Sequence, residues 1–209
     1  YGEPLTDTWK KSGDDWYYLD SDGIRATSTQ IDEYYVDEDG KRVTMKWISV
    51  ENEDYWSEQD EPEFLYYYYG RDGRALTSTW ASINGQWYYF WPLTENGHTQ
   101  GTMAYGGWKI IGADYYFFRE DGSLYTGWLE QNGSWYYLNT LDNSLQGAMF
   151  TGWLIREGKT YFLDADGVMA TGWYQVDGNW DYFWPDSGEM AKNQYINGFY
   201  VNEDGIWYR

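Results

Sequence analysis

Cysteine is absent from the 209 residues, histidine occurs once and proline four times. Without cysteine the chain has no disulfide framework, no thiol nucleophile and no thiolate metal site. No run of about 18 apolar residues is present, so the sequence predicts no membrane-spanning helix. Basic residues are scarce as well: 14 Lys and Arg face 34 Asp and Glu, a formal net charge of −20. A chain of that charge is repelled by phosphate backbones, which argues against nucleic-acid binding.

Aromatic residues are unusually abundant. They make up 22% of the chain as 15 Trp, 24 Tyr and 8 Phe, alongside 24 Gly. Disordered segments are poor in aromatics, so the composition predicts a folded protein despite its charge. The charge is uneven, because residues 1–70 carry 18 acidic and 6 basic side chains, whereas residues 71–209 carry 16 and 8. The chain opens at Tyr1 without a basic and apolar leader, and we expect it to be a mature or trimmed fragment.

The aromatics recur in a repeat of about 20 residues. Successive Gly-Trp pairs place Trp108, Trp128, Trp153 and Trp173 at steps of 20, 25 and 20 residues. The longer step is read as a five-residue insertion around 139–145. Each Trp is followed by a turn, an aromatic run and an Asp-Gly or related pair. We count nine units, of which 80–209 match the repeat better and 1–79 form degenerate acidic copies with an insert at 51–63.

Each unit has the pattern of a β-hairpin. Asn-Gly and Asp-Gly pairs supply the positive φ angles of two-residue turns, and they separate two strands rich in aromatics. An isolated hairpin is at best marginally stable, so the units must bury their rings against their neighbours. Clean helical periodicity is missing. The sequence therefore predicts an all-β protein, one continuous solenoid of β-hairpin repeats.

Other chemistry is not favoured. Asp20-Ser21-Asp22-Gly23 and its copies recur at one repeat position and lack the remaining ligands of a calcium loop, so we interpret them as turns. No carboxylate pair is placed across a cleft, and His98 has no triad partners. We therefore predict no enzyme activity, no metal and no cofactor.

The motif Gly-Trp, turn, Trp-Tyr-Tyr-Leu, Asp-Gly, Met-x-Thr-Gly-Trp resembles the cell-wall-binding (choline-binding) repeat of Gram-positive surface proteins, with related repeats in glucan-binding domains and clostridial toxins. The best match runs from Thr151 to Trp173. The resemblance implies hairpins stacked into a left-handed superhelix, with choline held between consecutive hairpins. Its cage would consist of the Gly-Trp ring and the Trp of Trp-Tyr-Tyr from one repeat, plus an aromatic ring of the next. Ring faces attract a quaternary ammonium ion through their quadrupoles.

Both cage Trp residues survive in four units, and the resemblance therefore implies up to three good sites and a weaker one at Trp9 and Trp16. Asp114 and Thr160 are read as replacing the second Trp in the intervening units. The third ring is Tyr115 or Tyr116 for the first site, Tyr161 or Phe162 for the second and Phe199 or Tyr200 for the third. The predicted ligand-binding residues are Trp80, Trp87, Tyr115, Trp128, Trp135, Tyr161, Trp173, Trp180 and Tyr200. The alternative for each of these Trp rings is core packing.

The function implied is a non-catalytic module that anchors a secreted protein to choline or teichoic acid at a bacterial cell surface. Two alternatives stay open. One is a glucan or host-glycan module, because exposed Trp before a loop, as at Trp91-Pro92 and Trp184-Pro185, would stack on sugars. The other is an adhesin or structural stalk in which the acidic N-terminal third, including the insert, contacts a partner. The oligomeric state is not predicted.

Overall fold

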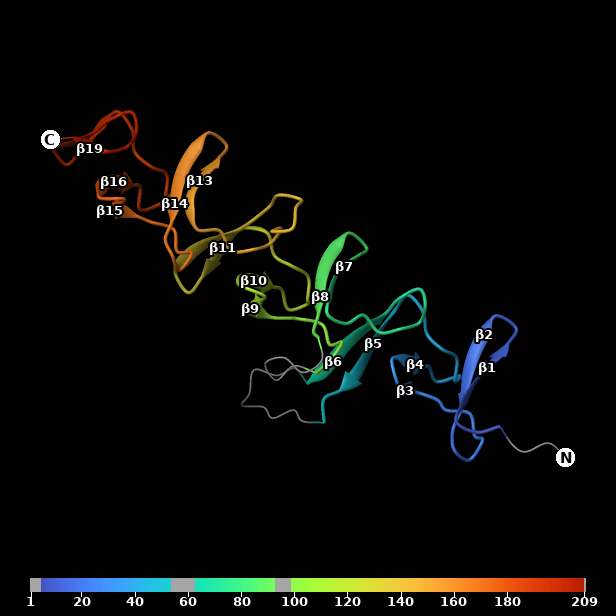
Figure 1. Cartoon of the computed structure of the whole chain (residues 1–209). Helices are drawn as coiled ribbons and strands as arrows, with labels where there is room; N and C mark the ends of the chain where they lie inside the picture. Colours follow the sequence, from blue (N-terminus) through green and yellow to red (C-terminus); the bar gives the residue numbers. More distant parts are fainter. Residues whose placement is uncertain (1–4, 54–62, 93–98, 209) are drawn as a thin grey trace. The chain divides into compact units, whose positions relative to one another are not determined.

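A computed structural model describes residues 5–53, 63–92 and 99–208 (Figure 1). Throughout these residues the regular structure is strand and no helix occurs. The described chain accordingly contains no helix long and apolar enough to cross a membrane. The strands divide between two compact units, Tyr1–Tyr105 and Gly106–Arg209. The predicted boundary at residue 80, between degenerate repeats and better-matching ones, concerns the sequence pattern and stays a prediction.

Unit 1 contains four antiparallel hairpins, formed by strand pairs β1–β2, β3–β4, β5–β6 and β7–β8. Their bounds are β1 Thr8–Ser12, β2 Asp15–Leu19, β3 Thr29–Ile31, β4 Tyr34–Val36, β5 Lys46–Glu51, β6 Phe64–Tyr69, β7 Thr79–Ile83 and β8 Gln86–Phe90. The predicted insert connects β5 to β6, and its residues 54–62 lie outside the described part of the chain. His98 lies outside it as well.

Unit 2 contains five hairpins, and the last is extended by a third strand. Their bounds are β9 Gly107–Ile111, β10 Asp114–Phe118, β11 Gly127–Gln131, β12 Ser134–Leu138, β13 Gly152–Arg156, β14 Lys159–Leu163, β15 Gly172–Val176, β16 Asn179–Phe183, β17 Gln194–Ile196, β18 Phe199–Val201 and β19 Trp207–Tyr208. The nine hairpins found in the described residues confirm the nine units that the sequence predicts.

The turns follow the sequence logic. Asn132 and Gly133 have φ angles of 54° and 80°, the left-handed pair that a two-residue hairpin turn requires. In several repeats the chain makes a second turn after the hairpin, and an Asp or Asn side chain stabilises it. The carboxylate of Asp164, for example, accepts hydrogen bonds from the backbone N–H groups of Asp166 and Val168 at 2.9 Å each. Asp20 and Asp37 do the same in their own turns. The recurring acidic motif is therefore a turn stabiliser.

The core lies between successive hairpins of a unit. On hairpin β11–β12, Trp128 and Tyr137 face the next hairpin, where they pack on Leu154, Tyr161 and Leu163. The last residue of the second strand is buried in most hairpins, as at Phe118, Leu138, Leu163 and Phe183, which are 0% exposed. A hairpin thus has two packing faces, one for the preceding hairpin and one for the following hairpin.

Candidate functional site

One strand register repeats from hairpin to hairpin and places two aromatic rings on the same face. In hairpin β11–β12, Trp128 pairs with Tyr137 and Glu130 pairs with Trp135. Residues that pair across strands, or lie two apart on one strand, share a face of the sheet. Trp128 and Trp135 therefore lie on the same face as diagonal neighbours. We call Trp128 the leading ring of its hairpin and Trp135, seven residues later, the second ring.

A third ring comes from the following hairpin and meets the leading ring edge to face. Trp128 contacts Tyr161 at 4.9 Å between ring centroids, with an interplanar angle of 65°. The same T-shaped contact recurs in both units, at distances of 5.0 to 6.0 Å. The further pairs are Trp9–Tyr34, Trp47–Tyr88, Trp108–Tyr136 and Trp173–Phe199. We call a leading ring, a second ring and this third ring a ring triad.

The second rings remain exposed although they are large and apolar. Tyr66, Trp87, Tyr115, Trp135 and Trp180 are between 37% and 46% exposed. Leading rings such as Trp128 and Trp173, by contrast, pack against the hydrophobic clusters between hairpins. Each triad therefore combines a leading ring that is held by packing with a second ring that is exposed to solvent.

In several triads, a residue from the second turn of the next repeat forms a backbone hydrogen bond to the second ring's residue. The backbone N–H of Met169 donates to the carbonyl of Trp135 at 2.8 Å, and its side chain packs against the same buried cluster as Trp128 and Tyr161. Met149 and Met103 make the same backbone bond to Tyr115 and Tyr66. Further along, the Met169 side chain lies against Gly188, where an added Cβ would collide with its sulfur. We call this residue the closing residue.

The structure brings together the predicted middle site. Trp128 and Trp135 share a face, and Tyr161 supplies the third ring. At the predicted last site, Trp173 and Trp180 share a face in the same register. The ring that meets Trp173 is Phe199, at 6.0 Å. Tyr200 instead pairs with Tyr195 on the other face of β18 and lies 5.1 Å from its ring.

The predicted first site joins residues of the two units. Trp80 packs on Tyr89 at 5.0 Å between ring centroids, and Trp87 shares its face by register, both within unit 1. Tyr115 and Tyr116 belong to unit 2. The grouping of Trp80 and Trp87 with a ring of unit 2 therefore stays a prediction.

The reading of Asp114 as the substitute for a second Trp is wrong. Tyr115 pairs with Ile110, two residues after Trp108, as Trp135 pairs with Glu130. Tyr115 is therefore the second ring of its own hairpin, and it completes a triad with Trp108 and Tyr136. The signal was present in the sequence, since the seven-residue interval from leading to second ring holds for Trp108 and Tyr115.

A further triad in unit 1 escaped sequence reasoning because the insert separates its members. Trp47 lies on β5, and Tyr66, on the partner strand β6, pairs with Ser49. The third ring, Tyr88, lies 5.0 Å from Trp47. The insert lengthens the usual seven-residue interval to 19 residues, so spacing alone did not connect Trp47 with Tyr66.

The first triad, Trp9, Trp16 and Tyr34, contains a charged group of the protein itself. Its closing residue is Arg42, whose backbone N–H donates to the carbonyl of Trp16 at 2.8 Å. The guanidinium carbon lies 5.5 Å from the Trp16 ring centroid and 5.2 Å from that of Tyr34. Guanidinium over ring faces is a cation–π arrangement. The weaker site expected here thus already holds an internal cation.

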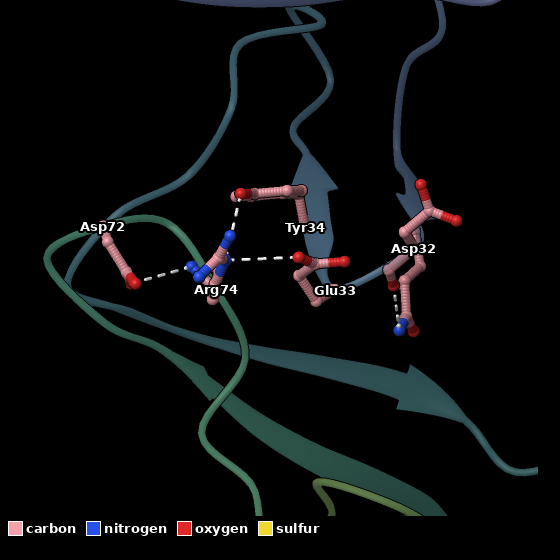
Figure 2. Close-up of polar contacts among 6 residues, drawn as sticks. Asp32, Glu33, Tyr34, Asp72 and Arg74 are labelled. Atoms are coloured by element: carbon pink, nitrogen blue, oxygen red, sulfur yellow. Dashed lines mark hydrogen bonds and ion pairs between the residues drawn. The ribbon is translucent and has the colours of Figure 1, made fainter.

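A second arginine holds Tyr34 from its hydroxyl end. Figure 2 shows Arg74 between Tyr34 and Glu33: its Nε donates to the Tyr34 hydroxyl at 3.1 Å and lies 3.1 Å from a Glu33 oxygen. Its backbone N–H donates to the carboxylate of Asp72. The hydrogen bond to Tyr34 and the charges of Tyr34 and Glu33 raise the pKa of Arg74. This region of unit 1 is therefore organised by ionic contacts in place of an open triad.

One triad position in unit 2 is interrupted. Trp153 leads hairpin β13–β14, but Thr160 stands in the second-ring position because it pairs with Ile155. Asp181 stands where the third ring is expected, opposite Tyr174. It is 2% exposed, and burial raises its pKa to about 6.

Of the two loop tryptophans expected to be exposed, Trp91 is buried and Trp184 is exposed. Trp91 is only 4% exposed and packs edge-on against Tyr89, so it is a core residue. Trp184 stays 36% exposed, with its ring 5.3 Å from that of Tyr182. Within the described residues, no three His, Asp or Glu side chains group as metal ligands would.

Family comparisons agree with this repeat. A family model described as a choline-binding repeat matches residues 105–145 and 150–195, and a second choline-binding repeat model matches residues 3–42. A model described as a putative cell wall binding repeat matches residues 78–90. Together these models match well over half of the chain. No curated protein matches it by sequence.

Solved structures of choline-binding proteins are similar along nearly the whole chain. CbpF in complex with ipratropium is 31% identical, with a TM-score of 0.67, and the match covers 98% of this chain and 60% of that one. This chain thus spans less than two thirds of the CbpF chain in that complex. The choline-binding domain of CbpL from Streptococcus pneumoniae is 28% identical, with a TM-score of 0.70 and 98% of both chains covered. Choline binding protein F from S. pneumoniae, crystallised in the presence of a peptidoglycan analogue, is 28% identical, with a TM-score of 0.60 and coverage of 93% and 76%. The chain belongs to the choline-binding repeat family, whose repeats form cell-wall-binding modules.

Proposed function

We propose that the chain is a non-catalytic module that binds choline groups of a bacterial cell wall and thereby anchors a secreted protein at the cell surface. The observation that supports this most strongly is the triad of Trp128, Trp135 and Tyr161. It offers two packed rings and one open ring around one position, the arrangement that attracts a quaternary ammonium ion without a hydrogen bond.

Four triads of the described chain are proposed to bind choline. Those completed within one unit are Trp47/Tyr66/Tyr88, Trp108/Tyr115/Tyr136, Trp128/Trp135/Tyr161 and Trp173/Trp180/Phe199. The pair Trp80 and Trp87 is proposed as part of a fifth site. The first triad is excluded from this set because Arg42 lies over its rings.

The expected affinity follows from the number of rings. Each ring face contributes roughly 0.5–2 kcal/mol to holding an organic cation, so three contribute on the order of 2–6 kcal/mol. A Kd of about 1 mM corresponds to roughly 4 kcal/mol. Each single site is therefore expected to be weak, and attachment to a wall depends on several sites engaging together.

Chromatography tests the ligand class. The protein is loaded on a quaternary-amine resin and challenged with sodium chloride and with choline chloride at equal ionic strength. We expect choline to elute it at concentrations where sodium chloride does not. If both salts eluted the protein alike, its retention would be explained by ion exchange of an acidic protein. Retention on dextran with no choline effect would instead favour the glycan alternative, since the same rings can stack on sugars.

A further inference from the structure

Asp181 is a buried carboxylate at a position where the other hairpins carry a ring. In β14 the corresponding residue is Tyr161 and in β18 it is Phe199, and each contacts the leading Trp of the hairpin before it. Asp181 is 2% exposed. Substitution of a ring by a carboxylate at this depth is costly unless the charge is compensated.

The face that carries Asp181 packs against the preceding hairpin. Phe183, two residues further along β16 and on the same face, lies 6.0 Å from the ring of Trp153. Tyr174, which pairs with Asp181, lies 5.8 Å from Phe162. Asp181 thus stands between the two hairpins, on the side of Trp153.

The hairpin that precedes Asp181 has no second ring. Thr160 occupies that position with a much smaller side chain, and Met190 is the closing residue, its N–H donating to the Thr160 carbonyl at 2.8 Å. Trp153 keeps 42% of its surface exposed. By the register of the other triads, Trp153, Thr160, Asp181 and Met190 therefore occupy the leading, second, third and closing positions of one site.

The Asp181 carboxylate has no compensating partner within the described part of the chain: no hydrogen bond or ion pair to its oxygens is found there, and burial is what shifts its pKa. Lys159, which precedes Thr160, is held by Glu189 at 3.0 Å. Burial alone raises the pKa of Asp181 to about 6, so at neutral pH most molecules carry an uncompensated charge there.

We propose that Asp181 and Trp153 form a separate cation site that selects an organic ammonium ion bearing N–H donors, such as a primary amine, over a quaternary one. A primary ammonium group donates charge-assisted hydrogen bonds to the carboxylate, while its charge and methylenes lie against the Trp face. A quaternary ammonium ion has no N–H to donate, so it gains only the ring contact. The ligand class at this position thus differs from that of the ring triads, and the inference does not depend on choline binding there.

The five methionines allow each site to be observed separately. Met103, Met149, Met169 and Met190 are closing residues of four different sites, and Met45 is an exposed reference at 61% exposure. With 13C-methyl methionine, each methyl gives one NMR signal, assigned by Met→Leu substitution. Ethanolamine hydrochloride, choline chloride and sodium chloride are titrated at pH 7.5 into the wild-type protein, Asp181→Asn and Asp181→Tyr.

We expect ethanolammonium to shift the Met190 signal saturably in the wild-type protein and at least tenfold more weakly in Asp181→Asn. Asp181→Tyr should lose this response too. Unchanged choline shifts at Met149 and Met169 in the variants show that they are folded. A Met190 signal that does not respond to ethanolammonium, responds equally in Asp181→Asn, or responds equally to sodium overturns the proposal. If choline did not shift the Met149 and Met169 signals of the wild-type protein, that result would instead count against the proposed function.

Discussion

Replacement of Trp135 by Ala should weaken one choline site while leaving the fold intact. Trp135 is 44% exposed, and the packing between its hairpin and the next is made by Trp128, Tyr137 and their neighbours. The substitution therefore removes the open wall of the triad and little of the core. Loss of one ring face is expected to cost about 1–2 kcal/mol of binding, which weakens the site roughly 5- to 30-fold.

The assay is a choline titration followed at the methyl signal of Met169, the closing residue of this triad. Trp184→Ala is the matched control, because Trp184 is similarly exposed, at 36%, and lies outside the triads. The Met169 midpoint should move to higher choline concentration in Trp135→Ala only. A midpoint shared by the wild-type protein and Trp135→Ala would refute the reasoning, because the exposed ring would then contribute nothing to the ligand.

Three further predictions concern the first triad, the last triad and Asp181. Arg42→Met should remove the cation from the Trp9/Trp16/Tyr34 triad and add one bound choline per chain in calorimetry. Arg42→Lys keeps a cation there and should add none. Equal stoichiometry in both variants would contradict the account of Arg42. Phe199→Ala should weaken choline binding at the last triad several-fold, whereas Tyr200→Ala should leave it unchanged; the number of bound choline equivalents in a titration is the readout. If Tyr200→Ala weakened binding and Phe199→Ala did not, Tyr200 would be the third ring. The pKa of Asp181 is raised from 3.8 to about 6, so its contribution to the free energy of unfolding is complete below pH 4 and is lost as pH rises through 6, by up to roughly 3 kcal/mol. Urea unfolding should show this decline in stability in the wild-type protein and not in Asp181→Asn. Parallel pH profiles of the two proteins would count against a buried, uncompensated carboxylate.

The architecture was predictable because its signals are local. A Trp after Gly, an Asn-Gly or Asp-Gly turn and a second aromatic run specify a hairpin, and their recurrence gives nine of them. The middle triad followed as well, since Trp128 and Trp135 stand seven residues apart and Tyr161 occupies the same position of the next unit. The left-handed superhelix stays a prediction from the resemblance.

The remaining features depend on register and on contacts between repeats. The role of Tyr115 as the second ring of its own hairpin was missed because Asp114 was aligned with that position, a one-residue error that turns a side chain to the other face. Phe199 and Tyr200 are also one residue apart and lie on opposite faces of β18, so only Phe199 faces Trp173. The role of Arg42 had a visible signal: Asp39-Gly40-Lys41-Arg42 aligns with Asp166-Gly167-Val168-Met169, so an arginine stands where a closing methionine is expected. The burial of Asp181 had no comparable signal, because it comes from packing by the preceding hairpin.

The central claim is that choline binds at the ring triads, and the five methionine methyl signals test it most directly. In a choline titration of the full chain at constant ionic strength, Met103, Met149 and Met169 should shift saturably with midpoints near the millimolar range, while the exposed Met45 does not move. No shift at the three closing methionines, or an equal non-saturating drift at all five, would contradict the account.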